Sequence, residues 1–366
     1  MKKLVREYRF VWLSFVIWIA SLGILQILAP FLYPLRTGYL GPVPWANFDG
    51  IHYLTLAKSG YFQYGEAFFP FYPILIANIH RILPIPDYSI GMGISLGSTL
   101  IGLVFLYRLV LEEFGKKVAR WSVVFALSFP TSFFFAAVYT EGLFFALVLL
   151  TVYFVKKDNY ILAGTTAMLA GATRFVGIFL IFFIIYGLLK KRQKTRIWWY
   201  ASLVLAPLGC ICFMYYLYVR NGDPLAFFHV QPAFGANRSG GEIILFPQVL
   251  WRYAKIIWSA FLQPTLASYA ISLLELLMTF ASLLIVWIGI RYRVHWKYLF
   301  YSLVLIVIPT LSGTFSSMPR YMLSAFPLFI ILALIRPKTI QWVVLIACCI
   351  FQIFLAPLFL RGWFVA

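Results

Sequence analysis

The stretch Asn47-Phe48-Asp49-Gly50-Ile51-His52-Tyr53 places an acid, an imidazole and a phenol within five positions of a mainly apolar chain. Asp49 and His52 are three residues apart, so they share a face if this segment is a helix. Hydrophobic segments flank the stretch on both sides, and an aromatic, proline-rich run, Phe68-Phe69-Pro70-Phe71-Tyr72-Pro73, follows it. The sequence therefore places a group of polar side chains between hydrophobic segments.

The composition of the chain indicates a membrane protein. Of its 366 residues, 63% are hydrophobic and only 11% are charged, whereas soluble domains average about 45–50% apolar and about 25% charged residues. The aromatic content of 20% is consistent with belts of Trp and Tyr at membrane interfaces. These values predict an all-α polytopic membrane protein that forms a single domain over residues 1–366.

The formal net charge of +19 has two readings. In a soluble protein it suggests nucleic-acid binding, but Lys and Arg also collect on the cytoplasmic side of membrane segments. The basic run of residues 190–196 follows an apolar segment directly, so it is read as a topology anchor, with phosphoinositide or nucleic-acid binding as the alternatives. We expect membrane lipids, and no nucleic acid, as partners.

Apolar runs and basic clusters together predict about eleven transmembrane helices. The first resembles a retained signal anchor with the N-terminus in the cytoplasm, and the C-terminus then lies outside. The predicted spans cover about 10–32, 88–110, 121–137, 142–155, 160–173, 175–189, 197–219, 266–290, 298–311, 321–335 and 340–360. This topology puts two long segments, about 35–87 and 221–263, on the extracytoplasmic side of a multi-pass plasma membrane protein.

The first outer segment contains two short apolar pieces, at about 49–60 and 71–83. A spanning helix needs about 20 residues, so both pieces are expected to be interfacial or re-entrant helices. Asp49 begins the first of them, where helix N-terminal amides favour a carboxylate. It is therefore a candidate general base, although Asp is also a common N-cap.

Further candidates lie at the predicted outer ends of the spans. Glu141 is near membrane depth, where ionisable groups usually face a cavity or a partner; a helix cap is the alternative. Arg174 and Arg320 interrupt apolar sequence, and they either snorkel to the interface or bind an anionic headgroup. Glu275, within a predicted span, can be a buried partner of one of these arginines.

The chain contains no Walker loop, no dinucleotide-binding glycine motif and no HExxH zinc motif, which argues against an ATP-driven pump or a zinc protease. Acids and arginines instead gather at one predicted face. That arrangement suits an enzyme that acts on a lipid-linked phosphate at the membrane surface.

The opening stretch resembles the first-loop signature of PIG-V-type mannosyltransferases, approximately W/F-D-x-x-H-Y, I-A-x-x-G-Y and F-F-P-x-Y-P. Later matches follow in the family's order. They are Phe129-Pro130-Thr131-Ser132, Ala137-Val138-Tyr139-Thr140-Glu141, Ala172-Thr173-Arg174 and Pro319-Arg320-Tyr321. The resemblance covers about 45–325, and the chain looks more like a prokaryotic relative than the longer eukaryotic members.

This resemblance implies a GT-C fold and an inverting transfer of a sugar from a polyprenyl-phosphate donor, most of all mannose, to a lipid or glycan acceptor. It implies that Asp49 is the catalytic base. It also implies that substrate binding involves His52, Tyr53, Glu141, Arg174, Arg320 and Tyr321.

Two other classes of function remain open. A transporter or lipid flippase would carry charged residues near the bilayer midplane, often in repeated halves, but only Glu275 lies clearly inside a predicted span and no repeat is visible. A non-catalytic scaffold would not gather acids and arginines on one face. Asp49, His52 and Glu141 are residue types that can hold a divalent ion, although their spacing does not require one.

Overall fold

The computed structural model describes residues 2–36, 40–191, 196–261 and 266–365, and this part of the chain is helical with no β-strand. The all-α prediction is therefore confirmed. Residues 192–195 of the predicted basic run lie outside the described residues. The α-helices are α1 (Lys2–Leu32), α2 (Asp49–Ser59), α3 (Phe71–Ile82), α4 (Asp87–Phe114), α5 (Lys116–Ser128), α6 (Glu141–Lys156), α7 (Tyr160–Gly171), α8 (Ile181–Lys190), α9 (Ala201–Asn221), α10 (Ala226–His229), α11 (Phe246–Phe261), α12 (Leu266–Arg291), α13 (Trp296–Thr310), α14 (Met318–Tyr321), α15 (Phe326–Leu334) and α16 (Lys338–Leu360).

Several helices are long and apolar enough to cross a membrane, which makes the chain a multi-pass membrane protein. Within the described residues there are five, and they are Tyr8–Leu32, Asp87–Phe114, Ile197–Asn221, Tyr269–Arg291 and Lys338–Leu360. The remaining predicted spans correspond to shorter helices such as α7 and α13, so the total of about eleven stays a prediction.

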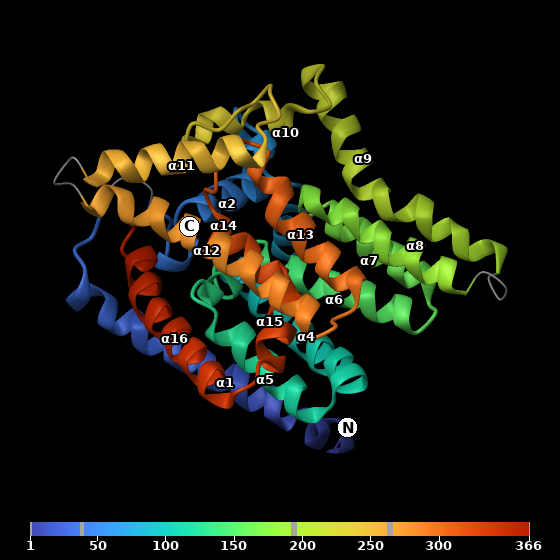
Figure 1. The fold of residues 1–366 in the computed structure, drawn as a ribbon. Coiled ribbons are helices and arrows are strands. Elements are labelled where there is room, and N and C mark those ends of the chain that lie inside the picture. Colours follow the sequence, from blue (N-terminus) through green and yellow to red (C-terminus); the bar gives the residue numbers. More distant parts are fainter. Residues whose placement is uncertain (1, 37–39, 192–195, 262–265, 366) are drawn as a thin grey trace.

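The two short helices of the first outer segment form as predicted, as α2 and α3. Figure 1 shows α2, α10, α11 and α14 together at one end of the molecule, with the N-terminus at the opposite end. The backbone of Phe71 donates to the carbonyl of Ala172 (3.0 Å), and that of Val138 donates to Trp45 (2.9 Å). These bonds fix the first outer segment against the ends of the helices beneath it.

Two predicted spans differ from the observed helices. The helix predicted at 121–137 ends at Ser128, because residues before a proline avoid the α conformation and Pro130 follows. The helix predicted at 321–335 is broken into α14, a 3₁₀ turn and α15. Pro327 in the first turn of α15 lacks the N–H that a continuous helix needs. Arg320 therefore lies in a short separate turn rather than at the start of a span.

The core is built around α6, whose residues from Glu141 to Leu149 are all buried. Close approach to α4 requires glycine at position 142, because a Cβ there would lie 2.5 Å from both the Ser95 carbonyl oxygen and Thr99 Oγ1. A similar constraint joins α7 to α9. A Cβ at Gly209 would collide with the carbonyl oxygen of Met168. Small residues thus allow these backbones to pack directly, as in many membrane helix pairs.

Gly209→Ala should lower the stability of the protein by about 1–3 kcal/mol, because the added methyl group forces α7 and α9 apart. The measurement is thermal unfolding in detergent. Gly23→Ala in α1 is the matched control, since a Cβ there meets nothing within 4 Å. Equal melting temperatures for the two variants would contradict the packing described here.

Candidate active site

Four charged side chains from four distant segments form one connected ion-pair network. Arg320 Nη1 donates to Asp49 Oδ2 at 2.6 Å, and Arg320 Nε lies 3.2 Å from Glu141 Oε1. Arg174 Nη1 lies 3.2 Å from the same Glu141 oxygen. The order is therefore Asp49–Arg320–Glu141–Arg174, with Arg320 shared between two carboxylates. The structure brings together four of the residues that the sequence singled out.

Asp49 is the more exposed carboxylate of this network and Glu141 is the buried one. The side chain of Asp49 is 26% exposed, whereas that of Glu141 is 1% exposed. Among the described residues neither oxygen of the Glu141 carboxylate accepts a hydrogen bond, so its contacts with the two arginines are ion pairs. An isolated carboxylate at such a position would cost several kcal/mol, and the two arginines offset that cost for Glu141.

Asp49 is held at the first position of α2 by an unusual backbone turn. Phe48, directly before it, has φ 54° and ψ −117°, a conformation that costs about 1–3 kcal/mol for a residue with a side chain. The Phe48 ring packs against Phe359 and Phe364, and this packing offsets the strain. The hydroxyl of Tyr139 donates to the Asn47 carbonyl at 2.9 Å, which fixes the turn from the other side.

Arg320 is positioned by the loop on either side of it. Thr131 Oγ1 donates to the carbonyl of Pro319 at 2.7 Å. The backbone N–H of Ser317, a residue in the left-handed conformation (φ 66°), donates to Glu275 Oε1 at 3.3 Å. Glu275 Oε2 accepts a bond from Tyr253 at 2.6 Å. The expected ion pair between Glu275 and Arg174 or Arg320 is therefore wrong, because Tyr253 and Ser317 occupy the carboxylate.

Three aromatic or imidazole candidates surround the network. The Tyr321 ring lies against both Arg174 and Arg320, with guanidinium carbons 5.1 and 5.9 Å from its centroid. Tyr53 is buried, and its hydroxyl is 3.5 Å from Thr140 Oγ1. His52 makes no ion pair with Asp49; its ring stacks on Phe68 at 4.8 Å and meets Phe62 at 5.8 Å.

The electrostatics of α2 favour a charged Asp49 beside a neutral His52. Burial raises the pKa of Asp49, but the nearby Arg320, which also bonds it, lowers that pKa further, so the net shift is downward from 3.8. Burial lowers the pKa of His52 below 6.5 despite the attraction of Asp49. Near pH 7 the carboxylate is ionised, as a general base must be, and the imidazole is uncharged.

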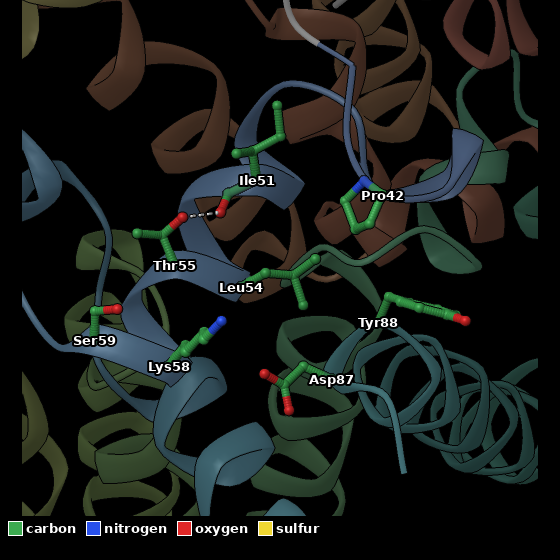
Figure 2. Close-up of a pocket in the computed structure, with 8 residues that line it drawn as sticks. All are labelled: Pro42, Ile51, Leu54, Thr55, Lys58, Ser59, Asp87 and Tyr88. Atoms are coloured by element: carbon green, nitrogen blue, oxygen red, sulfur yellow. Dashed lines mark hydrogen bonds between the residues drawn. The ribbon is translucent and has the colours of Figure 1, made fainter.

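A cavity of about 320 Å³ lies on the other side of α2. Figure 2 shows Ile51, Leu54 and Lys58 of α2 opposite Asp87 and Tyr88 at the start of α4. The spacing of the α2 residues puts them on the face opposite Asp49 and His52. This helix therefore separates the ion-pair network from the cavity.

The acids of the site are arranged for ion pairing. Within the described residues, no group of three or more His, Cys, Asp or Glu side chains is placed to hold a metal ion. Asp49 and Glu141 instead share the guanidinium of Arg320 between them.

Arg238, in the second outer segment, is a site residue that the sequence did not predict. Its Nη2 donates to Ser316 Oγ at 3.3 Å, four residues before Arg320. No local signal distinguished this arginine, because a cation in a polar, glycine-rich loop is unremarkable. Only the fold brings that loop to the network.

Glu141→Gln should destabilise the protein by about 3–5 kcal/mol, because it leaves the buried Arg320 and the partly buried Arg174 without their shared carboxylate. Denaturant unfolding in detergent measures this change. Glu112→Gln, which alters a partly exposed ion-paired acid near the C-terminal end of α4, should cost no more than about 1 kcal/mol.

A double variant tests whether the network acts as a unit. Glu141→Gln combined with Arg320→Gln should cost less than the sum of the two single changes, since each removes the other's uncompensated charge. Strict additivity would show that the two side chains do not interact.

The Asp49–Arg320 pair should contribute a constant stability between pH 8 and pH 5. A carboxyl whose pKa is lowered on folding stabilises the protein above its unfolded value of about 3.9, and this contribution is lost as the pH falls through the folded pKa. The melting-temperature difference between the wild type and Asp49→Asn should therefore narrow only below about pH 4.

Repeating this comparison in a His52→Gln background removes the neighbouring imidazole. A difference that already shrinks between pH 7 and pH 5 in that background would mean that the pKa of Asp49 is raised rather than lowered.

Comparison with known proteins gives limited similarity. No family model matches the chain, and no curated protein matches it at a significant level. The structure of ArnT from Cupriavidus metallidurans bound to undecaprenyl phosphate is similar, with a TM-score of 0.49 and 14% identity over 91% of this chain. Its apo state gives a TM-score of 0.45 and 15% identity over 91%. The chain spans 62% and 61% of those two chains, and the resemblance to PIG-V-type enzymes stays a prediction.

Proposed function

We propose that this protein is an inverting GT-C-type glycosyltransferase that transfers a sugar from a polyprenyl-phosphate donor to a lipid or glycan acceptor on the extracytoplasmic face. Mannose is the favoured sugar, from the resemblance of the first outer segment to PIG-V-type enzymes. The observation that carries the proposal is the Asp49–Arg320–Glu141–Arg174 network, at the end of the molecule where the outer segments meet.

In this proposal Asp49 is the general base. Its carboxylate is ionised and partly exposed, and it accepts the proton of the acceptor hydroxyl as that oxygen attacks the anomeric carbon. The bond from the anomeric carbon to the phosphate oxygen breaks, and its electron pair leaves with the polyprenyl phosphate. A phosphate leaving group needs no protonation, so one carboxylate suffices and the paired acids of glycosidases are not required.

The arginines stabilise the negative charge that develops on the phosphate. Arg320 lies 2.6 Å from the base, so a phosphate within reach of it would also be near the reacting hydroxyl. The planar guanidinium presents several N–H donors in a geometry that matches phosphate oxygens. Preorganised donors of this kind stabilise charge that grows in the transition state. His52, held between aromatic rings, orients the acceptor or Asp49.

The membrane setting suits a donor with a long hydrocarbon tail. The cluster lies close to apolar helices, including the buried start of α6, so a polyprenyl chain can remain among lipids or between helices while its phosphate reaches Arg320. Water-soluble sugar nucleotides would not need this arrangement.

Asp49→Asn should reduce sugar transfer by about 10²–10⁴-fold, the usual contribution of a positioned base. The assay uses purified protein, polyprenyl-phosphate mannose and candidate lipid acceptors, and it follows the transfer of labelled sugar. Asp87→Asn is the matched control, because this acid lines the cavity on the far side of α2 and its loss should leave the rate within about twofold of the wild type.

If the Asp49→Asn variant transfers sugar at the wild-type rate, Asp49 is not the general base. Movement of the polyprenyl phosphate between leaflets without any sugar transfer by the wild-type protein would instead favour the flippase alternative.

A further inference from the structure

Arg238 lies beside the ion-pair network and has no carboxylate partner of its own among the described residues. Its two hydrogen bonds are long and go to neutral groups: Nη1 donates to Gln231 Oε1 at 3.2 Å and Nη2 to Ser316 Oγ at 3.3 Å. Arg174 and Arg320, in contrast, are already paired with Glu141 and Asp49. Within the described residues Arg238 therefore forms no salt bridge, and the acids Asp49 and Glu275 act on its charge only at longer range.

The position of Arg238 is fixed from both sides. The ring of Phe234, four residues earlier, meets the His52 ring at 5.7 Å. On the other side, Arg252 Nη1 donates to the carbonyls of Asn237 (2.9 Å) and Gly313 (2.8 Å). The loop at 234–238 is thus held against the face of α2 that carries Asp49 and against the turn that precedes Arg320.

Arg238 is close enough to Asp49 to act on its charge. Burial raises the pKa of Asp49 and Arg320 gives the largest opposing effect, but the charge of Arg238 adds to the lowering. This effect is consistent with the two contacts of the loop, Phe234 with His52 and Arg238 with Ser316.

The total charge of the network explains why a further cation matters. Asp49 and Glu141 carry two negative charges, and Arg174 and Arg320 carry two positive charges, so the four together are neutral. A polyprenyl-phosphate sugar brings one negative charge to the phosphate. A second one develops on it when the bond to the anomeric carbon breaks and the electron pair moves to the phosphate oxygen. Asp49 accepts a proton in the same step, which leaves the network with one net positive charge, so the network balances only one of these two negative charges.

We propose that Arg238 binds the phosphate of the polyprenyl-phosphate donor, through guanidinium N–H groups that Gln231 and Ser316 do not use. This inference rests on the function proposed above. Arg238 then offsets the added negative charge of the donor and of the departing polyprenyl phosphate. Arg320 keeps its Nη1 bond to Asp49, which holds the base in place, and donates to the phosphate only through its other N–H groups.

The experiment measures equilibrium binding of undecaprenyl phosphate and of uncharged undecaprenol to the full-length protein in neutral detergent. Arg238→Gln should weaken binding of the phosphate lipid by about tenfold or more, which is the usual effect of losing a charge-assisted hydrogen bond. Its binding of undecaprenol should not change. Arg238→Lys keeps the charge and should retain more phosphate-lipid affinity than the Gln variant.

Lys255→Gln is the matched control. Lys255 lies on α11 of the same outer segment, with its ammonium over the exposed Trp251 ring at 5.3 Å, so this variant removes the same charge away from the network. Its affinity for undecaprenyl phosphate should equal that of the wild type.

Several outcomes would overturn the inference. If Arg238→Gln binds undecaprenyl phosphate as tightly as the wild type does, Arg238 is not part of the phosphate site. If both Arg238 variants lose affinity equally for undecaprenol and for undecaprenyl phosphate, the role of Arg238 is structural. Inorganic phosphate that binds as tightly as the lipid would show a site for free phosphate. Wild-type protein that neither binds undecaprenyl phosphate nor transfers sugar removes the proposed function as well. Wild-type binding and transfer with an unimpaired Arg238→Gln variant would reject Arg238 alone.

Discussion

The carboxylate of Glu141 is the constraint on which the rest of the site depends. It lies at the start of α6 with 1% of its side chain exposed, and Gly142 beside it packs directly against the backbone of α4. A buried charge of this kind is tolerated only when partners offset its desolvation. Arg174 and Arg320 must therefore converge on it, and Arg320 brings Asp49 with it. One buried acid thus ties the first outer segment, α6, the end of α7 and α14 into a single arrangement.

This arrangement keeps the base charged and also limits what the two paired arginines can do. Arg320 lowers the pKa of Asp49, which makes the carboxylate available across the neutral range but reduces its intrinsic basicity. If Arg320 left Asp49 to bind an incoming phosphate, the carboxylate would lose its main partner and face a new anion nearby. A separate cation, Arg238, reduces that competition because it shares the phosphate with Arg320, which can then keep its bond to Asp49.

The sequence predicted the parts of the molecule that local patterns determine. Long apolar runs located α1, α4, α12 and α16, and the polar spacing after Asn47 located α2. Prediction was wrong at 321–335, where Pro327 breaks the apolar run. The sequence also identified the charged candidate residues but not which of them form ion pairs. Asp49 and Arg320 are 271 residues apart, and no local pattern indicates such a contact. Arg238 was missed for the same reason, since its importance comes only from the fold.

Glu275 shows why an acid inside a membrane span need not indicate transport. It is the feature that most favoured a transporter in the sequence, since ionisable groups in spans often line a substrate path. Its carboxylate instead accepts bonds from the Tyr253 hydroxyl and the Ser317 N–H. These bonds fix the turn that carries both Ser316, the partner of Arg238, and Arg320. Because both carboxylate oxygens accept bonds that fix this turn, Glu275 has a structural explanation within the site, and that explanation requires no ion or substrate to pass along α12.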